Sequence, residues 1–285
     1  MGIGFEIPLA CHRIIAADNP KAKIGLPEIL VGIFPGAGGT TRLSRKMDMM
    51  TGSAYLMNGK LSDPQAAKRA GLIDDVVPAD ELLTAAKEWV KNATDADIVK
   101  PWDMKGFKMP GGAPYHPVGF MNYVGASAMI LGKTQGVYPA AKAMLSAIYE
   151  GAQVPFDTAI RIEARWFTKV LMNPSSSAMI KTLFTNKTAL EKGAVRPDGV
   201  ADMSVKKLGV LGAGMMGAGV AFVSARVGIE VVLLDRDQAS ADTGIATITG
   251  ILDQGVKRKK VTADQKEAIL GRIKATADYD DLKGC

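Results

Sequence analysis

The chain has few cysteines and histidines and no long uninterrupted run of apolar residues. Its two cysteines, Cys11 and Cys285, lie far apart without metal-binding spacing, so we expect two free thiols in a reducing compartment and no metal site. No apolar stretch approaches the roughly 20 residues that span a bilayer, which predicts no integral membrane segment. Residues 2–10 lack the positively charged start of a secretory signal, and Glu6 stands where its apolar part would be.

Composition and charge restrict the class of protein less sharply. A chain of 285 residues suits about two domains, and 47% hydrophobic with 22% charged residues is ordinary for a globular protein. The net charge of +6 suits an anionic ligand, and phosphate cofactors, coenzyme A and nucleic acid are all compatible with it. We interpret the basic run KRKK at 257–260 as a solvated helix end rather than a phosphate or nucleic-acid patch, and we expect no nucleic-acid partner.

The first region, residues 1–90, alternates apolar segments with turns. PGAGGTTR at 35–42 is a glycine-dense turn. Asp63 is suited to cap a helix that begins at Pro64 and is closed by Gly71, with a short strand at 73–77 and another helix at 79–90 to follow.

The middle of the chain changes character. Residues 101–125 are rich in proline and glycine without periodicity, which predicts a linker or irregular excursion. Residues 137–192 carry apolar side chains at helical spacing, which predicts helices that are broken at Pro155 and Pro174.

The third region begins near residue 204 and has the organisation of a dinucleotide site. A short buried strand at 208–211 leads into the G-x-G-x-x-G sequence at 212–217, and a helix of small and apolar residues then runs to Val227. A second apolar strand at 229–234 ends in Asp235. The fingerprint requires this strand, helix, strand and terminal acid, and a glycine-rich turn without a ligand is the alternative.

Each part of the fingerprint has a physical role. Gly212 allows the tight turn, Gly214 lets the backbone approach a pyrophosphate, and Gly217 allows close helix packing. The first turn of the helix, which includes Met215 and Met216, offers free amide groups and a partial positive charge to the phosphates.

Asp235 lies 23 positions after Gly212, near the expected offset of about 20. Its carboxylate would accept hydrogen bonds from ribose hydroxyls and repel a 2′-phosphate, which favours NAD over NADP. Arg236 beside it keeps NADP open, and FAD is a further alternative.

The stretch after Asp235 is long, polar and amphipathic. Apolar residues at 245–256 predict one helix, TADQ at 262–265 starts another, and RIKATADYDDL at 272–282 follows as third strand and turn. Together with GAGMMGAGVA, this stretch resembles the NAD-binding domain of 3-hydroxyacyl-CoA dehydrogenases, which carries a helical hairpin between its second and third strands. The resemblance covers roughly 205–285 and implies NAD as the cofactor.

The start of the chain, GIGFEIPLACHRIIAADNPKAKIGLPEILVGIFPGAGGTTRL, resembles the enoyl-CoA hydratase (crotonase) family. The resemblance implies two catalytic carboxyl groups, Glu6 and Glu28: one ionised to take a proton from water, the other able to deliver a proton to the α-carbon of an enoyl thioester. It also implies that the backbone N–H of Ile3, where the family has glycine, is an oxyanion donor. Without the resemblance, Glu28 after Pro27 reads as a first-turn helix residue and Glu6 as a surface residue.

The glycines of the PGAGG turn have no ligand role in this interpretation. We take Gly36, Gly38 and Gly39 as residues that form the turn.

The two resemblances in this order are typical of the multifunctional α-subunits of fatty-acid β-oxidation. They imply an α/β fold with three parts: the C-terminal part of a crotonase-like domain (1–100), a linker with connecting helices (101–203), and the N-terminal half of a Rossmann NAD-binding domain (204–285). The implied activities are hydration of 2-enoyl-CoA and NAD-dependent oxidation of 3-hydroxyacyl-CoA. The implied partners are an acyl-CoA substrate and a thiolase subunit.

The resemblance also implies parts that this sequence lacks. A complete hydratase domain has a long N-terminal part with another oxyanion donor, and the dehydrogenase needs a histidine after its third strand. His12 and His116 both precede the fingerprint and read as structural or exposed. We therefore expect an internal fragment of a larger enzyme with little or no turnover alone, in a bacterial cytoplasm, with mitochondrial and peroxisomal locations open. A non-catalytic nucleotide-binding or scaffold protein and a different NAD enzyme with a helical N-terminal domain are the alternatives.

Overall fold

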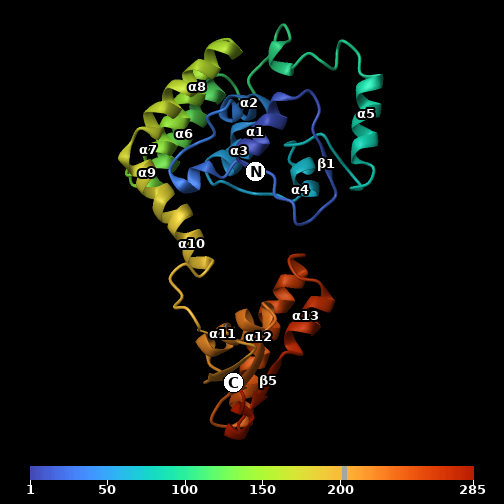
Figure 1. The fold of residues 1–285 in the computed structure, drawn as a ribbon, viewed down its shortest axis with the longest axis vertical. Helices are drawn as coiled ribbons and strands as arrows, with labels where there is room; N and C mark the ends of the chain where they lie inside the picture. Colours follow the sequence, from blue (N-terminus) through green and yellow to red (C-terminus); the bar gives the residue numbers. More distant parts are fainter. Residues whose placement is uncertain (201–203) are drawn as a thin grey trace. The chain divides into compact units, whose positions relative to one another are not determined.

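The computed structural model describes residues 1–200 and 204–285, which form two compact units, 1–195 and 196–285 (Figure 1). Each unit has its own buried hydrophobic cluster. The end of the connecting stretch expected to reach residue 203 lies outside the described residues, and the expected three-part division stays a prediction.

The first unit consists mainly of helices, with one short pair of parallel strands in which Ile15 lies opposite Asp75. Its elements in chain order are α1 (Ile3–Ala10), β1 (Ile15–Ala17), η1 (Glu28–Val31), α2 (Gly39–Lys46), α3 (Met49–Leu56), α4 (Pro64–Arg69), β2 (Asp75–Val77), α5 (Leu82–Asn92), η2 (Pro101–Asp103), α6 (Pro117–Thr134), α7 (Pro139–Gly151), α8 (Phe156–Leu171), α9 (Pro174–Met179), η3 (Ile180–Asn186) and α10 (Lys187–Glu191).

The helix expected after Asp63 is confirmed. The Asp63 side chain caps α4 by accepting a hydrogen bond from the Ala66 amide at 2.8 Å, and Pro64 takes the first helical position. Gly71 follows with a φ of 76°, a left-handed conformation that glycine adopts readily. The strand expected at 73–77 is shorter, because only Asp75–Val77 pairs with β1.

The expectation of irregular chain up to residue 125 is wrong in its second half. Helix α6 begins at Pro117, because the missing N–H of proline is tolerated at the first helical position. Tyr123, Ala126 and Ile130 are buried along one face at helical spacing, a pattern that the Pro/Gly content upstream obscured.

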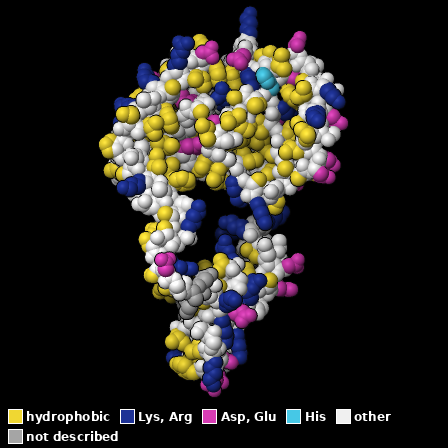
Figure 2. Space-filling view, viewed as in Figure 1, with side chains coloured by type: hydrophobic (Ala, Val, Ile, Leu, Met, Phe, Trp, Pro, Cys, Tyr) yellow, Lys and Arg dark blue, Asp and Glu magenta, His cyan; other side chains and the backbone are white. Residues whose placement is uncertain are grey.

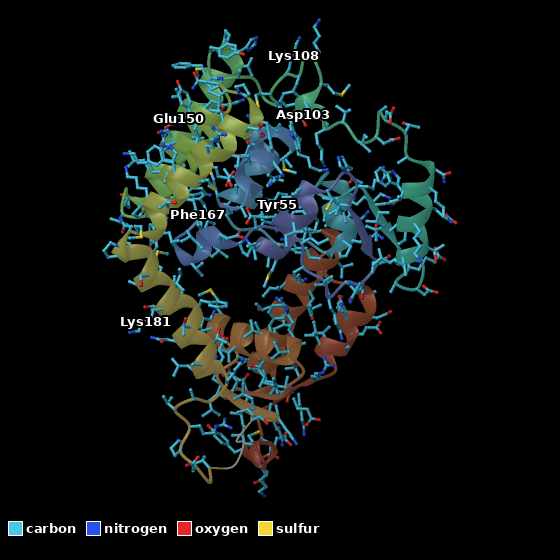
Figure 3. All side chains as sticks on the ribbon, turned by 45° about the horizontal axis from the view of Figure 1, so that its top comes forward. Tyr55, Asp103, Lys108, Glu150, Phe167 and Lys181 are labelled. Carbon is cyan, nitrogen blue, oxygen red and sulfur yellow. The ribbon has the colours of Figure 1, made fainter. Side chains whose placement is uncertain are left out.

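The helices expected at 137–192 are confirmed, with Pro155 and Pro174 at the breaks. Helices α7 and α8 lie side by side (Figure 1). Glu150 of α7, labelled in Figure 3, pairs with Arg165 of α8 and accepts a hydrogen bond from Trp166 Nε1 at 2.9 Å. These contacts join α7 and α8 along one side of the unit.

The core of the first unit fixes the PGAGG turn against α8. Leu26, Phe34 and Leu43 are fully buried around the turn. Phe167 of α8, labelled in Figure 3, packs edge-on against Phe34 with the ring centroids 5.7 Å apart. Burial of such large apolar groups contributes roughly 1.5–3 kcal/mol each.

Apolar side chains also lie on the surface of this unit. Figure 2 shows them over a broad part of the visible face of residues 1–195. Ile3, Ile7 and Leu30, which flank the two glutamates in sequence, are 67%, 65% and 54% exposed. None of the described helices is both long and apolar enough to cross a membrane.

The second unit is a three-stranded parallel sheet with helices. The strands pair in the order β3–β4–β5, as expected for the start of a Rossmann domain. Its elements are β3 (Lys207–Leu211), α11 (Met215–Arg226), β4 (Glu230–Leu234), α12 (Gln238–Lys257), α13 (Ala263–Leu270), β5 (Ile273–Thr276) and η4 (Tyr279–Leu282).

The expected helical hairpin between the second and third strands of this sheet is confirmed. It consists of α12 and α13, and Thr262 and Gln265 form a reciprocal capping box at the start of α13. Residues 257–260 are exposed at the end of α12, as expected of a solvated helix end.

Candidate functional site

Glu6 is buried on α1 and is held by the PGAGG turn. The residue is 4% exposed, and its Oε1 accepts hydrogen bonds from the amides of Ala37 at 2.9 Å and Gly39 at 2.7 Å. A Cβ on Gly39 would lie 2.5 Å from Oε1, so only glycine allows this approach. Burial raises the pKa of Glu6, while the two amides and the Arg42 charge act to lower it. The alternative interpretation, in which Glu6 is a surface residue, is therefore wrong.

Glu28 opens the short helix η1, and one of its oxygens has no partner. Among the described residues, Glu28 Oε2 is the buried side-chain polar atom that lacks a hydrogen bond. Burial raises the pKa of Glu28 to about 6, and the negative charge of Glu6 also acts to raise it. An orphaned buried acceptor costs free energy and is typical of a group that meets a ligand.

The turn at the start of α1 lies against Glu28. A Cβ on Gly2 would come within 3.2 Å of Glu28 Oε1, and the Gly2 amide donates to the Gly25 carbonyl at 3.0 Å. The positive φ of this turn, 63°, falls on Gly2, whereas Ile3 is the first residue of an ordinary right-handed helix. A side chain at Ile3 therefore imposes no backbone strain, and its first-turn amide has no acceptor within the helix.

A third buried carboxylate, Glu163 of α8, was missed from the sequence. It is 1% exposed, and its Oε1 and Oε2 accept hydrogen bonds from the amides of Gly38 and Thr41, each at 2.7 Å. Burial raises the pKa of Glu163 to about 7, and Glu6 also acts to raise it. The available signal was a charged residue four positions after Ala159 on the buried face of α8.

The turn glycines do more than form the turn. Gly38 has a left-handed φ of 93°, as expected, but the amides of Gly38 and Gly39 also bind carboxylates. Because these amides open helix α2, the positive end of its dipole favours the negative charge.

The two histidines, His12 and His116, are exposed and lie in the first unit. Within residues 1–200 and 204–285, no group of three or more His, Cys, Asp and Glu side chains is arranged to hold a metal ion.

The dinucleotide fingerprint of the second unit has the backbone geometry that a pyrophosphate requires. Gly212 turns with a φ of 94°, and a Cβ on Gly217 would lie 1.7 Å from the Gly212 carbonyl oxygen. A Cβ on Gly214 would meet no atom within 4 Å, so the chain leaves open space there. Helix α11 starts at Met215, and first-turn amides such as that of Met216 have no intrahelical acceptor.

Asp235 directly follows β4 and lies beside this turn. Its Oδ2 accepts from the Ala213 amide at 2.6 Å and its Oδ1 from the Arg236 amide at 2.7 Å, which lowers the pKa of Asp235. The Arg236 guanidinium lies 3.3 Å from a carboxylate oxygen of Asp237, so it has an acidic partner of its own. These residues fit a dinucleotide with free ribose hydroxyls.

Comparison with known proteins finds one family match in each unit. Residues 1–100 match the enoyl-CoA hydratase/isomerase family, and residues 207–285 match the 3-hydroxyacyl-CoA dehydrogenase NAD-binding domain. The two matches fall in separate units, the hydratase/isomerase match in the first and the dehydrogenase match in the second. The expected α/β fold, with a crotonase-family part and a Rossmann NAD-binding part, is confirmed, and NAD is the cofactor of the second family.

Single relatives match both parts of the chain. The chain is 34% identical to the fatty acid oxidation complex subunit alpha of Acinetobacter baylyi and 31% identical to that of Shewanella frigidimarina. Each match covers 99% of this chain and 39% of the relative, so the chain spans about two fifths of the relatives' length. The expected resemblance to these α-subunits is confirmed.

Among solved structures, the (S)-3-hydroxybutyryl-CoA dehydrogenase of Ralstonia eutropha is 42% identical over 28% of this chain and 28% of its own, with a TM-score of 0.28.

Proposed function

We propose that the first unit carries an enoyl-CoA hydratase site with Glu6 and Glu28 as its acid–base pair, and that the second unit binds NAD. The observation that supports the hydratase site is that Glu6 and Glu28 interact electrostatically but have different surroundings. Glu6 is anchored by two amides, whereas Glu28 has a free buried oxygen. Environments that separate the pKa values of two carboxyl groups allow one to act as base and the other as acid.

In this proposal Glu6 is the base and Glu28 the acid. The amides of Ala37 and Gly39 favour the ionised form of Glu6, which takes a proton from water as the water oxygen bonds to the β-carbon. Glu28, with a pKa raised to about 6, gives a proton to the α-carbon. The Ile3 amide donates to the thioester oxygen, where negative charge develops. Return of the proton from Glu6 to Glu28 through solvent completes the cycle.

An apolar cleft next to η1 supports an acyl-CoA substrate. Its volume is about 280 Å³, and it is lined by Ile29 and Leu30, which follow Glu28, and by Met129 and Ile130 of α6. Apolar clefts of this kind suit hydrocarbon chains, with the polar groups at one end. We place the acyl chain here and the thioester toward Glu28.

In the second unit, Gly212, Gly214 and Gly217 with the amides of Met215 and Met216 would hold the pyrophosphate. Asp235 would accept hydrogen bonds from the ribose hydroxyls. NAD supplies the hydride acceptor when bound. Residues 196–285 contain no histidine, so we propose that this unit binds NAD without oxidising 3-hydroxyacyl-CoA by itself. Calorimetric titration with millimolar NAD tests the binding; absence of heat from an intact fold would contradict it.

Crotonyl-CoA hydration, followed as loss of enoyl thioester absorbance, tests the acid–base pair. We expect the chain to be slow compared with typical enzymes, because Ile3 is the single oxyanion donor that we assign. Its rate above background should fall about a hundredfold or more in Glu6→Gln and Glu28→Gln, but not in Glu88→Gln, an exposed control on α5. A wild-type rate equal to background, or a rate that both substitutions leave intact, would overturn the proposal.

The names and sources of the relatives support a proposal for the substrate, the partner and the location of the protein. They are bacterial proteins named as subunits of a complex. We extend the proposal to an acyl-CoA substrate, a thiolase partner subunit and a cytoplasmic location, and co-purification of the tagged chain with a thiolase tests the partner.

A further inference from the structure

Glu163 is a buried carboxylate that the proposed acid–base chemistry does not use. It comes from α8, 125 positions after Gly38 in sequence, yet its two oxygens bind the same turn that holds Glu6. Arg45, which is buried and donates to the Gly151 carbonyl at 2.8 Å, supplies a nearby positive charge to Glu163. Burying a carboxylate this deeply is costly unless hydrogen bonds and an opposite charge compensate for the lost hydration.

The amides of the turn alternate between the two carboxylates. Ala37 and Gly39 donate to Glu6, whereas Gly38 and Thr41 donate to Glu163. Because each peptide unit is planar, holding the Gly38 amide fixes the Ala37–Gly38 peptide plane, and holding the Thr41 amide fixes a second plane three residues later, so the backbone between these two planes has little freedom to rotate. The direction of the Gly39 amide, which points at Glu6, therefore depends on how Gly38 is held.

Helix α8 contacts this turn at a second point. A Cβ on Gly36 would lie 2.3 Å from the ring of Phe167, one helical turn after Glu163, so backbone and ring are in close contact. Phe167 is itself fixed by its edge-on contact with Phe34. Two side chains of α8 therefore hold the turn: the Phe167 ring packs against its start, and the Glu163 carboxylate binds amides at its end.

We propose that Glu163 is a positioning residue for Glu6. By accepting hydrogen bonds from the amides of Gly38 and Thr41, it orients the turn so that the amides of Ala37 and Gly39 point toward the Glu6 carboxylate. It touches no substrate and acts through the turn. Its effect on hydration rests on the proposed hydratase function, whereas its effect on the turn does not.

Glu163→Gln tests this role on the whole chain. Glutamine keeps the shape but offers one acceptor oxygen, because its NH₂ group cannot accept, so one of the two amides loses its partner. Asp157→Asn is the matched control, since it removes one negative charge from an exposed position on the same helix. Amide-detected NMR gives the exchange rates of Ala37 and Gly39, and carboxyl-detected NMR gives the titration of Glu6.

In Glu163→Gln we expect the Ala37 and Gly39 amides to exchange about tenfold faster or more. We also expect the Glu6 pKa to move upward, because its ionised form loses hydrogen bonding. Loss of the neighbouring negative charge alone would move the Glu6 pKa downward, so the direction separates positioning from simple electrostatics. Asp157→Asn should change neither quantity.

Unchanged exchange at Ala37 and Gly39, or a Glu6 pKa that falls or stays the same in a folded Glu163→Gln chain, would overturn the inference. If that variant does not fold, Glu163→Asp provides the test: it keeps both acceptor oxygens on a shorter stem, and both effects should appear at smaller size.

Hydration kinetics separate this inference from the proposed function. We expect Glu163→Gln to lower kcat with little change in KM, and Glu163→Asp to restore part of kcat. NMR effects without wild-type hydration would refute the hydratase function alone, and normal hydration with unchanged amides would refute the positioning alone.

Discussion

Raising the pH should destabilise the first unit, because it holds buried carboxyl groups that favour the protonated form. For Glu163, the pKa rises from 4.5 to about 7 on folding because burial disfavours the charge. Its contribution to stability is therefore complete below about pH 4.5 and is lost as the pH rises through about 7. A shift of this size corresponds to about 3 kcal/mol, lost at roughly 1.4 kcal/mol per pH unit across that interval. The raised pKa values of Glu6 and Glu28 act in the same direction.

Tryptophan fluorescence isolates this effect, because all three tryptophans, at positions 89, 102 and 166, lie in the first unit. Urea unfolding between about pH 5 and pH 8 should show a falling free energy of unfolding for the wild type. Glu163→Gln should lose about 2.5 kcal/mol less over this interval, because only the part of the shift above pH 5 falls within it, whereas the exposed Asp157→Asn should follow the wild type.

A wild-type free energy of unfolding that is flat or rises from pH 5 to pH 8 would refute this reasoning. The same pH dependence in Glu163→Gln and the wild type would refute the assignment to Glu163. Lowered pKa values at carboxylates such as Asp48 do not interfere, because their contribution is lost only as the pH falls below the ordinary aspartate range.

Three further substitutions test separate parts of the chain. Asp235→Ala should weaken NAD binding about tenfold or more in calorimetry, since the ribose hydroxyls lose their acceptor; unchanged affinity would contradict the assigned role. Gly217→Ala should abolish NAD binding and lower the melting temperature of the second unit, because the added Cβ meets the Gly212 carbonyl; a normal melting temperature would count against that contact. Asp63→Ala should destabilise the first unit by about 1 kcal/mol in urea unfolding, because the Ala66 amide loses its cap, and a change near zero would show that this cap is unimportant.

Local patterns in the sequence determined most of the second unit. A strand, a glycine turn, a helix and an acid at the end of the next strand are short-range features, and each depends on neighbouring residues. The Gly212 turn, the cap at Thr262 and the place of Asp235 therefore follow from sequence alone. The irregular stretch before Pro117 was also visible, but its end was not, because proline signals both a break and a helix start.

The state of the two glutamates was decided only by the tertiary structure. The sequence placed Glu6 and Glu28 in motifs, but whether a carboxylate is buried, anchored or orphaned depends on the chain that packs around it. Glu163 shows this most clearly, because no local pattern joins it to a turn more than a hundred residues earlier. The physical reason is that desolvation and hydrogen bonding act through space, so the sequence determines which groups can ionise and packing determines where their charge is tolerated.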